Sequence, residues 1–186
     1  MTTLVVVLII LMIVGMTGVG IYNRMITLRN AIGNASGDMD VQMKMRFDLV
    51  DNLVNTVKWY ADHEKTTFEE ITKARTGFMS ATSPAEKDAA SNMLTSSLKS
   101  LFAVSENYPE LKANTNFLQL QNQLSDIENQ IAASRRYYNA TIKDYNDAIM
   151  TFPNNLLAGI FGFVSQTWFL ITDESQKNAP KVDFGK

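Results

Sequence analysis

Cysteine is absent from the 186-residue sequence, and histidine, proline and glycine are scarce, with one, four and nine residues respectively. Without cysteine the chain forms no disulfide, no thiolate metal site and no cysteine nucleophile. The single histidine, His63, excludes a histidine-rich metal site within one chain. Few prolines and glycines favour long helices over a loop-rich fold. The composition therefore argues against most enzyme classes.

A strong excess of charge of either sign is also missing. The 17 Lys and Arg residues are nearly balanced by 19 Asp and Glu residues, and no stretch is strongly basic. Because nucleic-acid binding needs a basic surface, we expect no nucleic-acid partner. Phosphate-loop, dinucleotide, serine-hydrolase and zinc-protease motifs do not occur. We therefore predict a non-enzymatic protein with no catalytic residue, no cofactor and no metal ion.

The first 21 residues carry no charged side chain, and Leu4 to Ile21 form an apolar run of 18 residues with one threonine. This is close to the minimum length of a helix that crosses a bilayer. A cleaved signal peptide is the alternative, but the sequence has neither a basic start nor a small-residue cleavage site. We predict a retained single-pass anchor over residues 1–22. Its candidate membrane residues are Leu4, Val7, Leu11, Val14, Gly15, Gly18, Ile21 and Tyr22.

Two arginines, Arg24 and Arg29, lie just beyond the apolar run, whereas the three residues before it include no Lys or Arg. By the positive-inside rule, this difference favours the cytoplasmic side for the rest of the chain. The opposite orientation stays open because two arginines are a small bias. Gly15 and Gly18 do not form the G-x-x-x-G pattern of closely paired membrane helices.

After the anchor, apolar residues recur at alternating spacings of three and four, as in helices that pack against helices. Gly33 and Gly37 are expected to bend or break the first helix. From Asp38 we predict one helix to Met79, about 60 Å long at ~1.5 Å per residue. Its seam comprises Met43, Phe47, Val50, Val54, Val57, Ala61, Phe68, Ile71 and Phe78.

A second helix start is marked by Ser83, Pro84 and Glu86, which form an N-cap, a first-turn proline and a capping box. Its apolar series is Ala90, Leu94, Leu98, Leu101 and Val104. Pro109 is expected to begin a further helix that ends before Pro153. The seam of that helix comprises Leu120, Leu124, Ile127, Ile131, Ser134, Tyr138, Thr141, Tyr145 and Ala148. We predict an all-α protein in which residues 23–155 form an elongated antiparallel bundle of three to four long, coiled-coil-like helices.

Residues 156–171 are strongly apolar but contain two glycines and a Ser-Gln-Thr interruption. One interpretation packs this segment on the bundle or on a second protomer. The other places it at the membrane surface, with its aromatic residues among the lipid headgroups. The candidate contact residues are Leu156, Leu157, Ile160, Phe161, Phe163, Trp168 and Phe169. Residues 172–186 are predicted to form a polar tail.

The charged residues of the bundle are expected on its surface. Arg46 and Lys44 lie among acidic residues, which favours surface ion pairs over a cation site. His63 is expected on a solvated helix face. Arg135 and its neighbours are expected to cover the bundle with their stems, with a contact to lipid phosphates or to an acidic partner as the alternative. Arg75 interrupts the seam and is expected to pair between helices.

Several blocks of the sequence resemble the LemA family. They are GIYNRMITLRN from Gly20, DMDVQMKMRFDLVDNLVNTVKWYADHE from Asp38, ITKAR from Ile71, YPELKANTNFLQLQNQL from Tyr108, IENQIAASRRYYNATIKDYNDAIMTFPNNLLAGIFGF from Ile127, and APKVDF ending at Phe184. The resemblance implies a bacterial protein that crosses the cytoplasmic (inner) membrane once and carries a helical bundle. It implies no agreed catalytic activity. Some members of the family are linked to organising intracellular membranes, and others to membrane quality-control proteases.

This chain departs from the family pattern at Ile127-Glu128-Asn129-Gln130, where the family usually has Thr-Glu-Asn-Arg. The departure changes the polar side chains available in that region. Taken together, these observations favour a structural scaffold that contacts membrane lipid and forms a homo-oligomer. The second interpretation is an adaptor that presents the bundle to another membrane protein, such as a quality-control protease.

Overall fold

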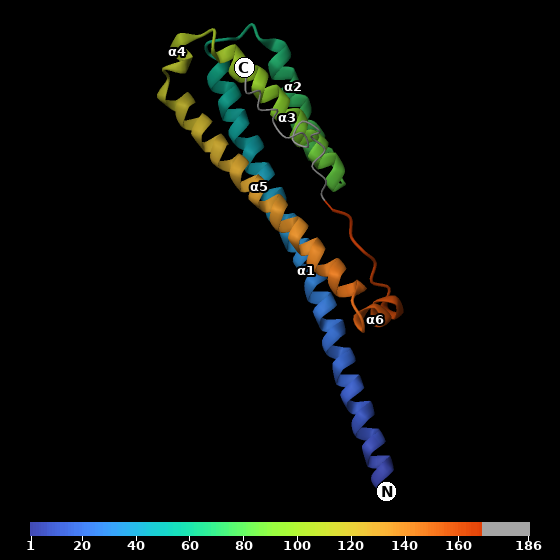
Figure 1. The fold of residues 1–186 in the computed structure, drawn as a ribbon. Coiled ribbons are helices and arrows are strands. Elements are labelled where there is room, and N and C mark those ends of the chain that lie inside the picture. The colour runs from blue at the N-terminus through green and yellow to red at the C-terminus, as the bar shows by residue number, and fades with distance from the viewer. Residues whose placement is uncertain (169–186) are drawn as a thin grey trace, which may run out of the picture.

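The fold consists of helices that run alternately up and down, as Figure 1 shows for a computed structural model that describes residues 1–168. The helices are α1 (Thr2–Lys58), α2 (Lys65–Ser80), α3 (Pro84–Ser105), α4 (Pro109–Lys112), α5 (Thr115–Met150) and α6 (Asn154–Phe161). The described residues include no strand. The prediction of an all-α antiparallel bundle behind a long apolar helix is therefore confirmed.

The first helix is continuous through both glycines at which we expected a bend. It runs for 57 residues, so the predicted break at Gly33 and Gly37 and the helix start at Asp38 are wrong. Ala35 and Met39 of the same stretch are buried in the core, while both glycines are exposed with no atoms near the position of a Cβ. Packing on one face thus holds the helix where glycine propensity, at ~1 kcal/mol per residue, would weaken it.

The prediction of one continuous helix over residues 38–79 is wrong. The chain reverses its direction at residues 59–64 and continues as α2. The sequence of this turn contains no proline or glycine. Ala61 is buried in it, and the Asn114 side chain donates a 3.0 Å hydrogen bond to the hydroxyl of Tyr60. Contacts between distant segments therefore hold a turn that the local residues do not mark.

The predicted seam survives this reversal, since all its members are buried: Met43, Phe47, Val50, Val54, Val57, Ala61, Phe68, Ile71 and Phe78. The two sides of the turn meet through the rings of Phe47 and Phe78, whose centroids are 4.7 Å apart. Arg75 is exposed and forms an ion pair with Asp51 of α1, so it joins two helices as expected. The spacing identified the buried residues correctly although it gave the wrong connection.

Helix α3 begins at the predicted capping box. The Glu86 amide donates to Ser83 Oγ at 3.3 Å, and the Ser83 amide donates to Glu86 Oε2 at 3.0 Å. Pro109 starts only the single turn α4, and Asn114 then caps α5 by accepting from the amides of Asn116 and Phe117. The long helix predicted from Pro109 is therefore divided in two.

Two buried clusters stabilise the molecule. The larger one joins α1 to α2, α3, α4 and α5 over the half of the bundle that lies far from the N-terminus. The smaller one comprises Met25, Tyr145, Ile149 and Ala158, with Ile21, Leu28, Leu157 and Phe163 packed against it. This second cluster packs the end of α5 and one face of α6 against α1, close to the apolar N-terminal stretch.

Candidate membrane-contact site

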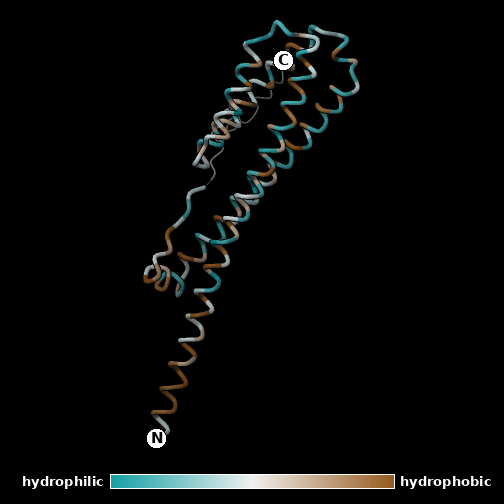
Figure 2. The backbone as a smooth tube through the Cα atoms, turned by 180° about the vertical axis from the view of Figure 1, so that it is seen from behind, coloured by the Kyte–Doolittle hydropathy of each residue, from teal (hydrophilic) through white to brown (hydrophobic). Residues whose placement is uncertain are grey.

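The first third of α1 stands alone outside the bundle. Figure 2 shows it as a continuous hydrophobic stretch, and its 18-residue window has a mean hydropathy of 2.9 with none of it buried. Each predicted anchor residue is exposed except Gly18 and Ile21, which are half-buried. This is one helix, within the described residues, that is long and apolar enough to cross a membrane.

A second apolar surface lies directly beside this stretch. It consists of Phe152, Leu156, Ile160, Phe161 and Val164, which are 54–74% exposed and which we call the apolar foot. Figure 1 places α6, which carries most of them, next to α1 at the end of the bundle nearest the N-terminus. Isolated exposed apolar residues are common, but a group this large usually contacts a partner or a membrane.

The opposite face of α6 packs on the bundle. Ala158 is buried, Leu157 is half-buried, and the Cδ1 of Leu157 lies 4.0 Å from the Cβ position of Gly18. Gly162 ends α6 with φ +69°, a left-handed conformation that glycine adopts without a steric penalty. The Phe163 amide then donates to the Ala158 carbonyl at 2.9 Å, as in a Schellman cap.

The Gly162 turn directs Phe163 back onto α1. Its ring lies 5.8 Å from that of Tyr22, and Arg29 lies over it at 5.7 Å from the centroid. The ring of Phe161 also meets Tyr22, edge to face, at 4.9 Å. Tyr22 is therefore an aromatic contact for α6 as well as the predicted interfacial residue of the anchor.

The segment after α6 is held against α5 by the side chains of Tyr145 and Asn146. The Asn146 side chain donates to the backbone carbonyl of Gln166 and accepts from the backbone amide of Gln166, both at 2.9 Å. The hydroxyl of Tyr145 donates to the carbonyl of Val164 at 3.1 Å. Asn146 is 5% exposed, so these bonds are shielded from water on one side.

Part of residues 156–168 packs on the bundle, as one interpretation expected, whereas contact with a membrane or with a second protomer stays a prediction. Leu157 and Phe163 face the bundle, while Leu156 and Ile160 face outward. Phe161 contacts Tyr22 on one side and is 54% exposed, and Trp168 is 47% exposed. Phe169 and the predicted polar tail over 172–186 lie outside the described residues. The predicted contact residues thus divide into an inner set that attaches α6 and an outer set that is available to a partner.

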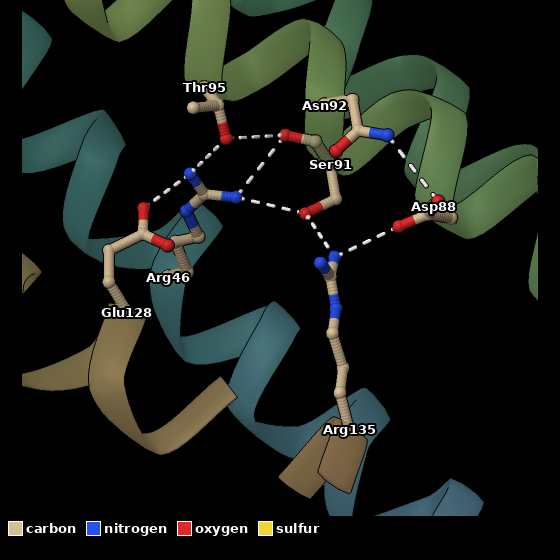
Figure 3. A network of polar contacts seen from close by, with 7 residues as sticks. All are labelled: Arg46, Asp88, Ser91, Asn92, Thr95, Glu128 and Arg135. Atoms are coloured by element: carbon tan, nitrogen blue, oxygen red, sulfur yellow. Dashed lines mark hydrogen bonds and ion pairs between the residues drawn. The ribbon is translucent and has the colours of Figure 1, made fainter. Parts of the chain in front are cut away.

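The strongest polar constellation lies in the bundle, where Arg46 of α1 reaches between α3 and α5 (Figure 3). Its guanidinium donates to Ser91 Oγ at 3.0 Å, to the Ser91 carbonyl at 3.3 Å and to Thr95 Oγ1 at 2.8 Å, and it forms an ion pair with Glu128. Arg46 is 1% exposed, so the expectation that it belongs to a surface ion-pair cluster is wrong. Burial lowers the pKa of Arg46, and Glu128 opposes that effect.

A second arginine extends this network. Arg135 of α5 forms an ion pair with Asp88 at 3.0 Å and donates to Ser91 Oγ at 3.2 Å. Asn92 donates to the same carboxylate at 3.4 Å. The side chain of Arg135 thus joins α5 to α3, and a lipid contact by Arg135 and its neighbours stays a prediction. The network therefore fixes how the α2–α3 hairpin sits on the α1–α5 pair.

Sequence reasoning missed Arg46, although a signal was present. Met39, Met43, Arg46, Val50, Leu53 and Val57 are buried at alternating spacings of four and three. Arg46 thus occupies a buried position in this series, which shares Met43, Val50 and Val57 with the predicted seam. A lone charge at such a position generally needs a partner from a neighbouring helix.

The remaining chemistry of the described residues is limited. His63 is exposed, as expected, and residues 1–168 include no group of three His, Asp or Glu side chains placed to hold a metal ion. A hollow of about 270 Å³ between α3 and α5 is lined mainly by apolar atoms and has Arg46 and Glu128, already paired with each other, at its wall.

Comparison with known proteins agrees with the resemblance described above. A model of the LemA family matches residues 35–184. Protein LemA of Metamycoplasma hominis is 30% identical over 144 residues, which cover 75% of this chain and 64% of that protein. Magnetosome protein MamQ 2 of Paramagnetospirillum magneticum is 25% identical, covering 80% of this chain and 64% of that protein.

The chain thus spans about 64% of the length of these two relatives. A third relative, magnetosome protein MamQ of Magnetospirillum gryphiswaldense, is 35% identical over 69 residues, or 37% of this chain and 25% of that protein. The family match covers most of the bundle and extends past α6. Together with the long apolar helix, it indicates a membrane-associated protein. The chain belongs to the LemA family.

Proposed function

We propose that this chain is a non-enzymatic scaffold that is anchored in the bacterial cytoplasmic membrane by α1 and assembles with copies of itself through the apolar foot. The observation that carries the proposal is the position of the foot, which adjoins the apolar part of α1. Anchored protomers lie in one plane at one height, so their feet are at the same level. Association there would order the anchors in a patch of membrane, with the bundles projecting to one side.

Two further observations support this function. The bundle is elongated, and the charged groups of its polar network pair with each other between helices. Both features suit a rigid spacer more than a catalyst. Phe152, Ile160 and Val164 are each at least 67% exposed, and apolar side chains grouped in this way usually contact a partner or a membrane. A neighbouring foot would cover them. The cytoplasmic side is proposed for the bundle, as Arg24 and Arg29 favour it.

Single-cysteine crosslinking tests this proposal, because the chain has no cysteine of its own. We expect Ile160→Cys, in native membranes, to form disulfide-linked dimers on mild oxidation. Met45→Cys is the matched control, since Met45 is 48% exposed on α1 within the bundle. Adding Leu156→Ser to Ile160→Cys should reduce the crosslinking by weakening the foot. Absence of crosslinks at Ile160, or equal crosslinking at both positions, would contradict assembly through the foot.

An adaptor function is the second candidate, and one observation favours it. Trp59 is 91% exposed in the turn between α1 and α2, at the end of the bundle farthest from the N-terminus. Tryptophan is enriched among the residues that dominate protein interfaces. If the chain is an adaptor, Trp59→Ala should release a protein that copurifies at a fixed ratio while leaving the unfolding temperature unchanged. Copurification that survives this substitution would argue against Trp59 as the contact.

A further inference from the structure

A polar hollow lies between α1 and α5 beside the start of α6. It has a volume of about 420 Å³ and is lined by Arg24, Leu28, Asp144, Asp147, Ala148, Thr151 and Asn154. Opposite charges therefore border one space, with a cation on α1 and two carboxylates on α5. Nothing in the scaffold function above requires this arrangement.

The charges in the hollow are only partly neutralised by the protein. Asp147 forms an ion pair with Lys143 at 2.5 Å. No ion pair among the described residues includes Arg24 or Asp144, and the charge of Asp144 acts on Lys143 only at longer range. Side chains on a helix tilt toward the N-terminus of that helix, and α1 and α5 are antiparallel. The Arg24 side chain is thus tilted toward the membrane anchor, and the carboxylates are tilted away from it.

The depth of the hollow follows from the length of α1. Arg24 is three residues beyond Ile21, the end of the apolar run, which is about 4.5 Å at ~1.5 Å per residue. The headgroup region on each side of a bilayer is roughly 5–8 Å thick. Arg24 therefore lies among the headgroups when α1 spans the membrane. This step depends on the proposed anchor but not on self-assembly.

The carboxylates lie at the same level or farther out. Met25 shares a buried cluster with Tyr145 and Ile149, which puts Arg24 about level with Asp147. Asp144 is three residues farther from the membrane on α5, or about 4.5 Å. From the bilayer outward, the hollow thus presents a cation first and a carboxylate second.

This order of charges is complementary to a zwitterionic lipid headgroup, whose phosphate lies deeper and whose amine extends outward. We propose that the hollow binds the headgroup of an aminophospholipid, phosphatidylethanolamine, with its phosphate at Arg24 and its ammonium group at Asp144. A primary ammonium donates hydrogen bonds to a carboxylate, whereas the quaternary ammonium of phosphatidylcholine has no N–H to donate. Phosphatidylglycerol supplies the phosphate but no cation. The amine contact therefore gives the hollow its selectivity.

Native mass spectrometry of the full chain tests the proposal. The protein is reconstituted in bilayers with equal amounts of phosphatidylethanolamine, phosphatidylcholine and phosphatidylglycerol of identical acyl chains, then released into detergent, and the retained lipids are counted. We expect phosphatidylethanolamine to be retained about three- to fivefold over each of the others, the effect of one exposed charge pair. Arg24→Gln should remove the retention, and Asp144→Asn should equalise phosphatidylethanolamine and phosphatidylcholine.

Two variants serve as matched controls, since Arg136 and Asp126 are exposed on α5 outside the hollow. Arg136→Gln and Asp126→Asn should leave the lipid ratio unchanged. Equal retention of the three lipids, or a preference for phosphatidylglycerol, would overturn the proposal. So would binding of soluble phosphoethanolamine as tight as that of the lipid, which would indicate a soluble ligand. Loss of the wild-type protein from membranes on alkaline washing would instead refute the anchor itself.

Discussion

The ion pair between Arg46 and Glu128 supports an asymmetric prediction. The two side chains differ sharply in solvent access, since that of Arg46 is 2% exposed and that of Glu128 is 41% exposed. If Glu128 loses its charge, Arg46 stays buried as an uncompensated cation. If Arg46 is replaced by an apolar residue, Glu128 remains in contact with water. Removing the carboxylate should therefore destabilise the bundle more than removing the cation.

The size of the effect follows from the contacts. Breaking a fully buried pair costs about 3–5 kcal/mol. Glu128→Gln should cost less, about 2 kcal/mol, because the site is open on the Glu128 side and because Arg46 keeps its bonds to Ser91 and Thr95. Arg46→Met should cost under about 1 kcal/mol. It also removes the Nε of Arg46, which is buried without a hydrogen-bond partner.

Thermal unfolding of the full chain in lipid nanodiscs, followed by circular dichroism, measures both variants. For a domain of this size about 1 kcal/mol corresponds to roughly 3–4 °C in Tm. We expect Glu128→Gln to lower Tm by about 6–8 °C and Arg46→Met by no more than about 4 °C. The double variant should resemble Arg46→Met, since no buried charge remains. The reasoning is refuted if Arg46→Met lowers Tm as much as Glu128→Gln does.

Two more predictions follow from hydrogen bonds at the ends of helices. Asn146→Leu removes both hydrogen bonds to Gln166. Amide hydrogen exchange over residues 163–168 should therefore accelerate at least tenfold, while the α1–α5 core stays protected. Unchanged exchange would mean that Asn146 does not hold this segment. Ser83→Ala should lower Tm by about 3–4 °C through the loss of ~1 kcal/mol from the α3 cap. Backbone hydrogen bonds from Thr82 and Ser83 hold the pKa of Glu86 below its ordinary value of 4.5, so this cap is complete above pH 4.5 and weakens as pH falls through the lowered pKa. In acid titrations, Glu86→Gln should therefore be less stable than the wild type above pH 4.5, and the difference should shrink as pH falls through the lowered pKa. A difference that grows on acidification would be inconsistent with this cap.

The sequence predicted the structure correctly where the signal lies within a few neighbouring residues. The spacing of Met43, Phe47 and Val50 identified core residues, since a helix in a bundle hides one face. Ser83 and Glu86 identified a helix start, since a capping box is satisfied by its own four residues. Both signals act within a few residues of the chain and do not depend on the rest of the fold.

The errors arose where distant contacts decide the structure. The turn at residues 59–64 is held by burial of Ala61 and by the bond from Asn114 to Tyr60, a residue 54 positions earlier. Arg46 was read as a surface residue because Ser91 and Thr95, which receive its hydrogen bonds, lie on another helix. The outward and inward faces of α6 could not be assigned either, since they depend on where Tyr22 and Gly18 lie.

The mass of the protein in its own membrane tests the scaffold function most directly. The chain has a mass of 20.8 kDa and can be extracted together with surrounding lipid by an amphipathic polymer. Light scattering should then give a protein mass of at least two times this value, in whole multiples, and the Leu156→Ser, Ile160→Ser double variant should reduce it toward a single copy. A wild-type protein that is extracted as one copy, alone or with a different protein, would contradict self-assembly.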